Sequence, residues 1–273
     1  MSRKRPLFAT LLAIMSPLCF AHGQGVEDRA AILRGNKFVA QANYEMAIRE
    51  YERVPPTAAR YAQALYNIGV CHYELWNTDR ALDFYALAIA AAKNNYPKAS
   101  YSRGVALEDL GRFAEAKEAF KQAINSSQGN FAPAQFRLGL LNAQDGDHSR
   151  AMRLFKEAIR RPGAHLPASH NNLGVVLAQL GRLQEAEHEF KTALRLSDGA
   201  LEDAAENLKL CREALANEKI KTAALKSLIL SRALRTGSLL SELLGQPDEN
   251  SFGAPDVAGP ILVCRYCCPQ SLA

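Results

Sequence analysis

The chain has 273 residues, of which 48% are hydrophobic and 22% are charged. This composition is that of a globular protein and excludes a chain that is disordered throughout. The formal net charge is +5, but Arg3, Lys4 and Arg5 contribute three of the positive charges. Without these three residues the net charge falls from +5 to +2, so charge alone gives little reason to expect a nucleic-acid partner.

The N-terminal segment differs from the rest of the chain. A basic start is followed by an apolar run from Leu7 to Ala21, which is short for a membrane-spanning helix. Small residues then offer cleavage positions near Ala21 or Gly23. This pattern predicts that residues 1–23 form a secretory signal peptide and that the protein is exported, to the periplasm or outside the cell. An uncleaved anchor and an organelle transit peptide are the alternatives.

Between residues 28 and 216 the sequence repeats with a period of 34 or 35 residues. Each unit has a glycine column, then an alanine column, and an aromatic column four positions after the alanine. The members of the three columns are Gly35, Gly69, Gly104, Gly139 and Gly174; Ala47, Ala81, Ala116, Ala151 and Ala186; and Tyr51, Tyr85, Phe120, Phe155 and Phe190. Each unit is predicted to form two helices of about 13 residues, and neither can bury its apolar stripe alone, so successive units must stack.

These columns resemble the tetratricopeptide repeat family. The best match runs from Asn171 through Gly174 and Ala186 to Ala193. The resemblance implies an all-α fold, a right-handed superhelical solenoid of tandem helix-turn-helix repeats, with five repeats and a capping helix over residues 28–216. A period of 35 residues also describes pentatricopeptide repeats, which bind RNA, but the pattern around their first helix does not occur here.

In that family the side chains just before each glycine line the concave face of the superhelix, and residues three or four positions after the glycine, such as Tyr73, add to the same surface. The resemblance therefore implies a groove for peptide segments of other proteins. Its expected lining is Tyr66, Asn67, Tyr73, Tyr101, Phe136, Arg137, Asn171 and Asn172. The aromatic row of Tyr66, Tyr101 and Phe136 is expected to supply most of the binding energy. In the alternative interpretation, the row only packs between adjacent first helices.

Chaperone-binding members of the family hold the terminal carboxylate of a peptide with lysine, asparagine and arginine side chains. Asn36, Asn67 and Lys98 match that pattern. Ile32 replaces its first lysine and Ser102 its arginine. Because two of the charges that would hold the carboxylate are absent, we do not expect such a clamp.

Basic residues follow the repeats. Five lysines and arginines stand between Lys219 and Arg235, with no acidic residue until Glu242. Together with apolar residues at helical spacing they predict a basic amphipathic helix over residues 217–245. This helix is expected either to cap the last unit or to lie on a membrane surface.

The C-terminal residues 246–273 are predicted to be a disordered tail because glycine, proline and polar residues dominate its first half. It contains Cys264, Cys267 and Cys268, and no histidine follows His188. Three cysteines without a fourth ligand make a poor zinc site, so incidental thiols or an interchain disulfide are expected.

No motif points to catalysis. The sequence contains no glycine-rich phosphate loop, no His-Glu-x-x-His and no Gly-x-Ser-x-Gly. We therefore expect no catalytic residues, no cofactor and no metal. The sequence predicts an exported protein–protein interaction scaffold that binds peptide segments of partner proteins in an envelope or secretory assembly. The alternative is a membrane-surface-associated structural or regulatory protein that uses the helix over residues 217–245.

Overall fold

The computed structural model describes residues 17–163, 165–217 and 223–231. Most of the predicted signal peptide and all of the cysteine-containing tail lie outside these residues. The described residues form eleven α-helices and no strand. The helices are α1 (Pro17–Ala40), α2 (Tyr44–Tyr51), α3 (Tyr61–Glu74), α4 (Thr78–Ala91), α5 (Pro97–Asp109), α6 (Phe113–Ser126), α7 (Ala132–Gln144), α8 (His148–Ile159), α9 (Leu166–Gln179), α10 (Leu183–Leu196) and α11 (Glu202–Ala216).

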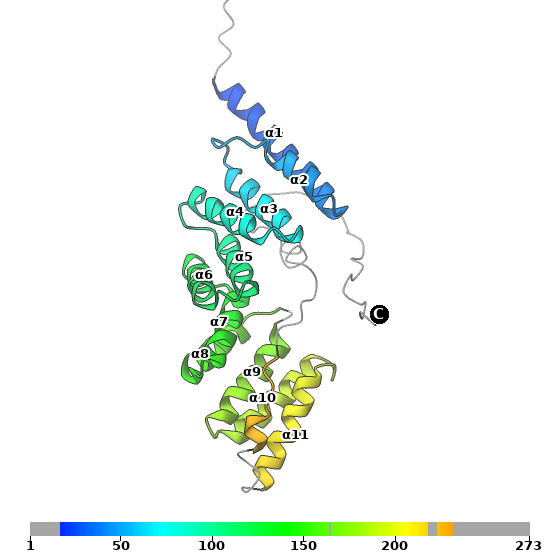
Figure 1. The fold of residues 1–273 in the computed structure, drawn as a ribbon, viewed down its shortest axis with the longest axis vertical. Coiled ribbons are helices and arrows are strands. Elements are labelled where there is room, and N and C mark those ends of the chain that lie inside the picture. Colours follow the sequence, from blue (N-terminus) through cyan, green and yellow to red (C-terminus); the bar gives the residue numbers. More distant parts are fainter. Residues whose placement is uncertain (1–16, 164, 218–222, 232–273) are drawn as a thin grey trace, which may run out of the picture.

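The helices pack as consecutive hairpins. Helices α1 and α2 form the first hairpin, and α9 and α10 form the fifth, after which α11 packs against both α9 and α10. Each hairpin also contacts the next one along the chain, because the second helix of one packs against the first helix of the next. Figure 1 shows this stack running from α1 and α2 at the top to α11 at the bottom. The predicted all-α solenoid is confirmed.

Each hairpin is held by an aromatic ring that lies directly on a glycine. A Cβ added to the glycine of the first helix would lie only 2.4 to 2.9 Å from a ring carbon of the second helix. The five pairs are Gly35 with Tyr51, Gly69 with Tyr85, Gly104 with Phe120, Gly139 with Phe155 and Gly174 with Phe190. All five rings are at most 2% exposed. The glycine column is therefore required because a ring occupies the place of its side chain.

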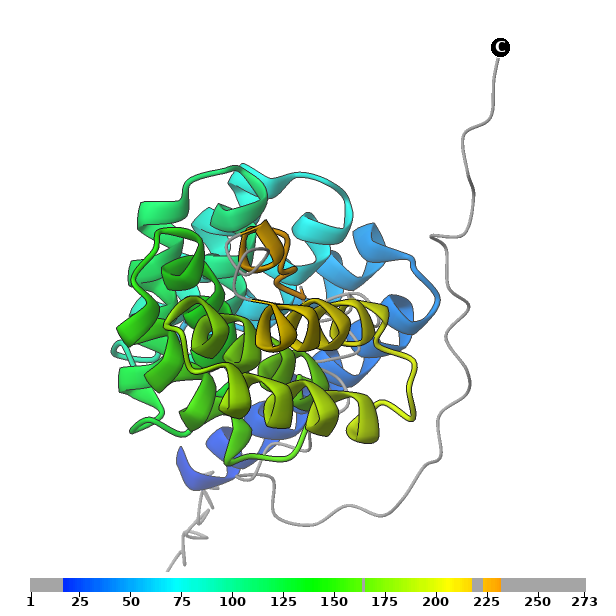
Figure 2. The same cartoon turned by 90° about the horizontal axis from the view of Figure 1, so that it is seen from below.

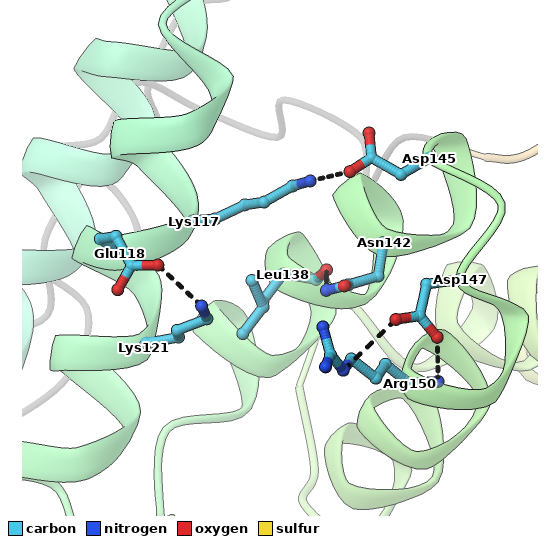
Figure 3. Close-up of polar contacts among 8 residues, drawn as sticks. All are labelled: Lys117, Glu118, Lys121, Leu138, Asn142, Asp145, Asp147 and Arg150. Atoms are coloured by element: carbon cyan, nitrogen blue, oxygen red, sulfur yellow. Dashed lines mark hydrogen bonds and ion pairs between the residues drawn. The ribbon is translucent and has the colours of Figure 1, made fainter.

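Polar contacts fix the turns and join neighbouring hairpins, as Figure 3 shows for the third and fourth. Gly146 ends the first helix of the fourth hairpin with φ +80°, a conformation that favours glycine. The Asp147 side chain then caps α8 by accepting a hydrogen bond from the Arg150 backbone N–H at 3.1 Å. Lys117 of α6 pairs with Asp145, which follows α7, and so links the two hairpins.

The chain leaves the helical pattern soon after α11. Residues 223–226 form one helical turn, and residues 228–231 belong to no helix or strand and run as an extended stretch, orange in Figure 1. Residues 227–231 therefore differ from the continuous helix predicted over 217–245. The reason is that the main chain of Ile229 and Ser231 bonds to side chains of the array, and a helix would keep those groups for itself. The rest of that predicted helix, residues 218–222 and 232–245, lies outside the described residues.

Because a ring lies on each column glycine, adding one methyl group at such a glycine should lower the stability of the fold. In Gly104→Ala the added Cβ would lie 2.5 Å from Cε1 of Phe120, and we expect the free energy of unfolding to fall by about 1–3 kcal/mol. The control is Gly25→Ala in α1, where nothing lies within 4 Å, and which should be neutral or stabilising by up to about 1 kcal/mol. Chemical denaturation followed by circular dichroism measures both. Equal responses of the two variants would contradict this role of the glycine.

Candidate functional site

Polar side chains connect the first helices of successive hairpins. Each of these contacts joins one first helix to the next, so the residues involved share one face of the solenoid. The contacts are Asn67 Nδ2 to Asn36 Oδ1 at 3.5 Å, the Tyr66 hydroxyl with the Ser102 hydroxyl at 3.4 Å, the Tyr73 hydroxyl to Asp109, Arg137 Nη1 to Glu108 Oε2 at 3.3 Å, and Asn207 Nδ2 to Asn171 Oδ1 at 2.9 Å. We call this shared face the inner face of the array.

The predicted aromatic row is buried. Tyr66, Tyr101 and Phe136 are 5%, 4% and 2% exposed. Each ring packs on the aromatic residue of its own hairpin, at centroid distances of 5.8 to 6.0 Å. Tyr66 and Tyr101 also touch a ring at the start of the next hairpin, Tyr96 and Phe131 respectively. These rings have little surface left for a partner, so packing between adjacent units accounts for the row.

Three other predicted residues, Asn67, Tyr73 and Arg137, lie on the inner face and are half-buried. Arg137 forms an ion pair with Glu108 of the preceding first helix, and both side chains are less than a fifth exposed. Partial burial strengthens such a pair relative to one in open solvent. The middle of the inner face therefore carries both a cation and an anion, with amide and hydroxyl groups on either side.

The last two predicted residues, Asn171 and Asn172, are fully buried. They lie against an extended part of the same chain, and with Asn207 they bond to the backbone of Ile229 and Ser231. Asn207 bonds to this segment together with Asn171 and Asn172, but it was not among the residues predicted from the sequence. It stands 35 residues after Asn172, in the same column of the repeat, so the repeat register could have identified it.

The two cysteines of the array have no sign of a chemical role. Cys71 and Cys211 are free thiols with no exposed surface. Burial raises the pKa of Cys71 to about 12 and that of Cys211 to about 11. Both thiols therefore stay protonated at neutral pH, and a protonated thiol is a poor nucleophile.

Neither a metal site nor a membrane-spanning helix occurs in the described part of the chain. Within it, no three histidine, cysteine, aspartate or glutamate side chains are placed to hold a metal ion together. None of the helices that these described residues form is both long enough and apolar enough to cross a membrane.

Comparison with known proteins gives a family and a set of similar folds. Models of the tetratricopeptide repeat match residues 32–97, 86–133, 101–167 and 167–200. No curated protein sequence matches the chain. Among solved structures, pilF of Pseudomonas aeruginosa is 16% identical with a TM-score of 0.58, and the match covers 82% of this chain and 99% of that chain.

Two further structures have the same fold. MamA of Desulfovibrio magneticus RS-1 is 17% identical with a TM-score of 0.53, and the match covers 65% of this chain and 99% of that chain. YrrB, described as a TPR protein with an unusual peptide-binding site, is 19% identical with a TM-score of 0.51, over 68% of this chain and 95% of that chain. At these identities the likeness shows the fold alone.

Proposed function

Because the chain belongs to the tetratricopeptide repeat family, we propose that it is a protein–protein interaction scaffold that binds peptide segments of partner proteins along its inner face. We propose no catalytic role for it. We further propose that it is exported, as the pattern over residues 1–23 predicts, and that it works in an envelope or secretory assembly.

One observation carries the proposal of peptide binding. The inner face already holds an extended piece of protein chain, because the side-chain amides of Asn172 and Asn207 bond to the backbone of Ser231 and Ile229. A surface that binds one extended segment through its backbone has the chemistry to bind another. The inner face continues beyond this point with Arg137, and a longer peptide could therefore contact several units.

The membrane-surface alternative receives less support. It requires the apolar side chains of residues 217–245 to face lipid. Among the described residues of that stretch, Ala224 is only 7% exposed, and Leu225 and Leu228 pack against the core of the last hairpins. Ala224 is covered by the array and Leu225 and Leu228 are partly covered, which leaves Ile229, 42% exposed, as the large apolar side chain on the solvent side of the described part of this stretch.

The scaffold proposal is tested by capturing partners with the full chain after crosslinking in its native host. Replacing both Asn67 and Arg137 with alanine removes an amide and a cation from the inner face, and we expect the yield of captured partner to fall by about tenfold. Helical circular dichroism should be unchanged. The matched control replaces an amide and a cation on exposed positions of α6, Asn125 and Lys121, and should capture as the unmodified chain does. Equal capture by both variants would count against the inner face.

The export proposal is tested by the mass of the chain isolated from the envelope or medium of its host. Cleavage near Ala21 or Gly23 predicts a mature chain that begins one to three residues after Ala21. A full-length chain confined to the cytoplasm would overturn this part of the proposal and leave the scaffold role to stand alone.

A further inference from the structure

A short segment of the chain, Leu228–Ser231, lies extended against helices α9 and α11; it is the last part of the orange stretch in Figure 2. Its three apolar side chains alternate between the array and solvent. Leu228 and Leu230 pack against the core of the last hairpins, and Ile229 between them is 42% exposed. Ser231 is only 1% exposed. The segment therefore sits on the array as a bound peptide does, with every second apolar side chain turned inward.

Two asparagines hold this segment by its backbone. Asn207 Nδ2 donates to the Ile229 carbonyl at 2.7 Å, and Asn207 Oδ1 accepts from the Ile229 N–H at 2.8 Å. Asn172 does the same with Ser231, at 2.7 Å in each direction. Each amide thus satisfies both polar backbone groups of one residue. Recognition of this kind depends on an extended backbone and is independent of the side chain of the residue it holds.

The spacing of the two amides matches that of an extended peptide. Asn172 and Asn207 are 35 residues apart and occupy equivalent positions in successive units. Ile229 and Ser231 are two residues apart, which is the period at which an extended chain presents its backbone groups in the same direction. A helical ligand could not bind in this way because its N–H and C=O groups are bonded to each other. The arrangement therefore selects an extended segment.

One position of the segment is also recognised by its side chain. The Ser231 hydroxyl donates to Asp203 Oδ2 at 2.7 Å and accepts from Asn171 Nδ2 at 2.9 Å. Asn171 also donates to the Ile229 carbonyl at 3.1 Å, and its own oxygen accepts from Asn207. The enclosed hydroxyl favours a serine at this place, because an aliphatic residue would leave the Asp203 carboxylate and the Asn171 amide without this partner.

The three asparagines form a site that needs an occupant. Asn171, Asn172 and Asn207 are all 0% exposed, and buried amides are costly unless their donors and acceptors are bonded. In the structure most of their partners belong to residues 229–231. If that segment leaves, water or another backbone must replace it.

On the basis of the proposed peptide-binding function, we propose that this asparagine cluster, Asn171, Asn172 and Asn207 with Asp203, is a docking site for a partner protein. Its ligand is an extended segment with the order apolar, any residue, apolar, serine. Residues 228–231 are the chain's own occupant, which a partner segment must displace. Because the occupant is tethered, its effective concentration is on the order of millimolar, and a free peptide should bind the intact chain weakly.

The test uses a fluorescein-labelled peptide with the sequence of residues 223–231 as the probe, and the full chain as the receptor. Ser231→Pro removes the N–H that bonds to Asn172 and the hydroxyl that bonds to Asp203, while the cluster itself is unchanged. We expect this variant to bind the probe about tenfold more tightly, or better, than the unmodified chain does, by fluorescence anisotropy. Ser231→Asp, which places a carboxylate against Asp203, is a second variant with the same expected result.

Matched controls separate backbone recognition from a general loss of structure. Adding Asn207→Asp to Ser231→Pro removes the donor to the Ile229 carbonyl, so probe affinity should fall again by about tenfold or more. Adding Asn130→Asp instead, at an exposed asparagine between α6 and α7, should leave affinity unchanged. A probe that is N-methylated at the positions of Ile229 and Ser231 lacks both N–H donors and should not bind.

Three results would overturn the inference. If neither Ser231 variant binds the probe although circular dichroism shows both folded, residues 228–231 are a permanent part of the array. If the unmodified chain dimerises by light scattering and Ser231→Pro does not, the segment belongs in a second copy rather than in its own chain. If partner capture depends on Asn67 and Arg137 but is unchanged by Asn207→Asp, the scaffold role stands and this docking site does not.

Discussion

The contact on which the structure depends is an aromatic ring lying on a glycine. It occurs in every one of the five hairpins, from Gly35 with Tyr51 to Gly174 with Phe190. Because the ring takes the place of a side chain, it sets both the distance and the rotation between the two helices of a hairpin. The residues just before each glycine are thereby placed in the same orientation in every unit. The columns of the inner face are a consequence of this repeated packing.

The sequence was sufficient to predict the hairpins, since five columns recur with a constant period and only stacked units can bury them. It was less informative about the inner face. For the row that begins at Tyr66 it left open whether the rings line a groove or pack between adjacent first helices. The reason is that a helix period does not say how far the next hairpin covers a side chain. Tyr96 and Phe131, at the starts of neighbouring helices, provide that cover.

Two features near the end of the array could not be obtained from local pattern. Lys209 replaces the column glycine in α11. The pattern of this last helix is therefore that of a capping helix, and it does not indicate that Asn207 binds a peptide backbone. Basic and apolar residues at helical spacing predict a helix over residues 228–231, but the structure has an extended conformation there. It is determined by hydrogen bonds to Asn207 and Asn172, over sequence separations of 22 and 59 residues respectively, and tertiary contacts of this kind override local propensity.

The inner face presents two kinds of polar group. The middle units present the Arg137–Glu108 pair, and the last two present amides that hold an extended backbone. In the proposed function, a scaffold built in this way would bind chain segments with modest dependence on their side chains and would gain specificity from a few positions, such as that of Ser231.

Backbone recognition at the inner face requires that the two asparagines hold residues 229–231 in solution. Amide hydrogen exchange of the full-length ¹⁵N-labelled chain measures this directly, because the N–H groups of Ile229 and Ser231 donate to Asn207 and Asn172. We predict that both amides exchange slower than an unstructured chain by on the order of 100-fold, and that Asn207→Leu, which removes the oxygen that accepts from the Ile229 N–H, abolishes the protection of Ile229. Exchange of both amides at the unstructured rate in the unmodified protein would contradict backbone recognition by these asparagines.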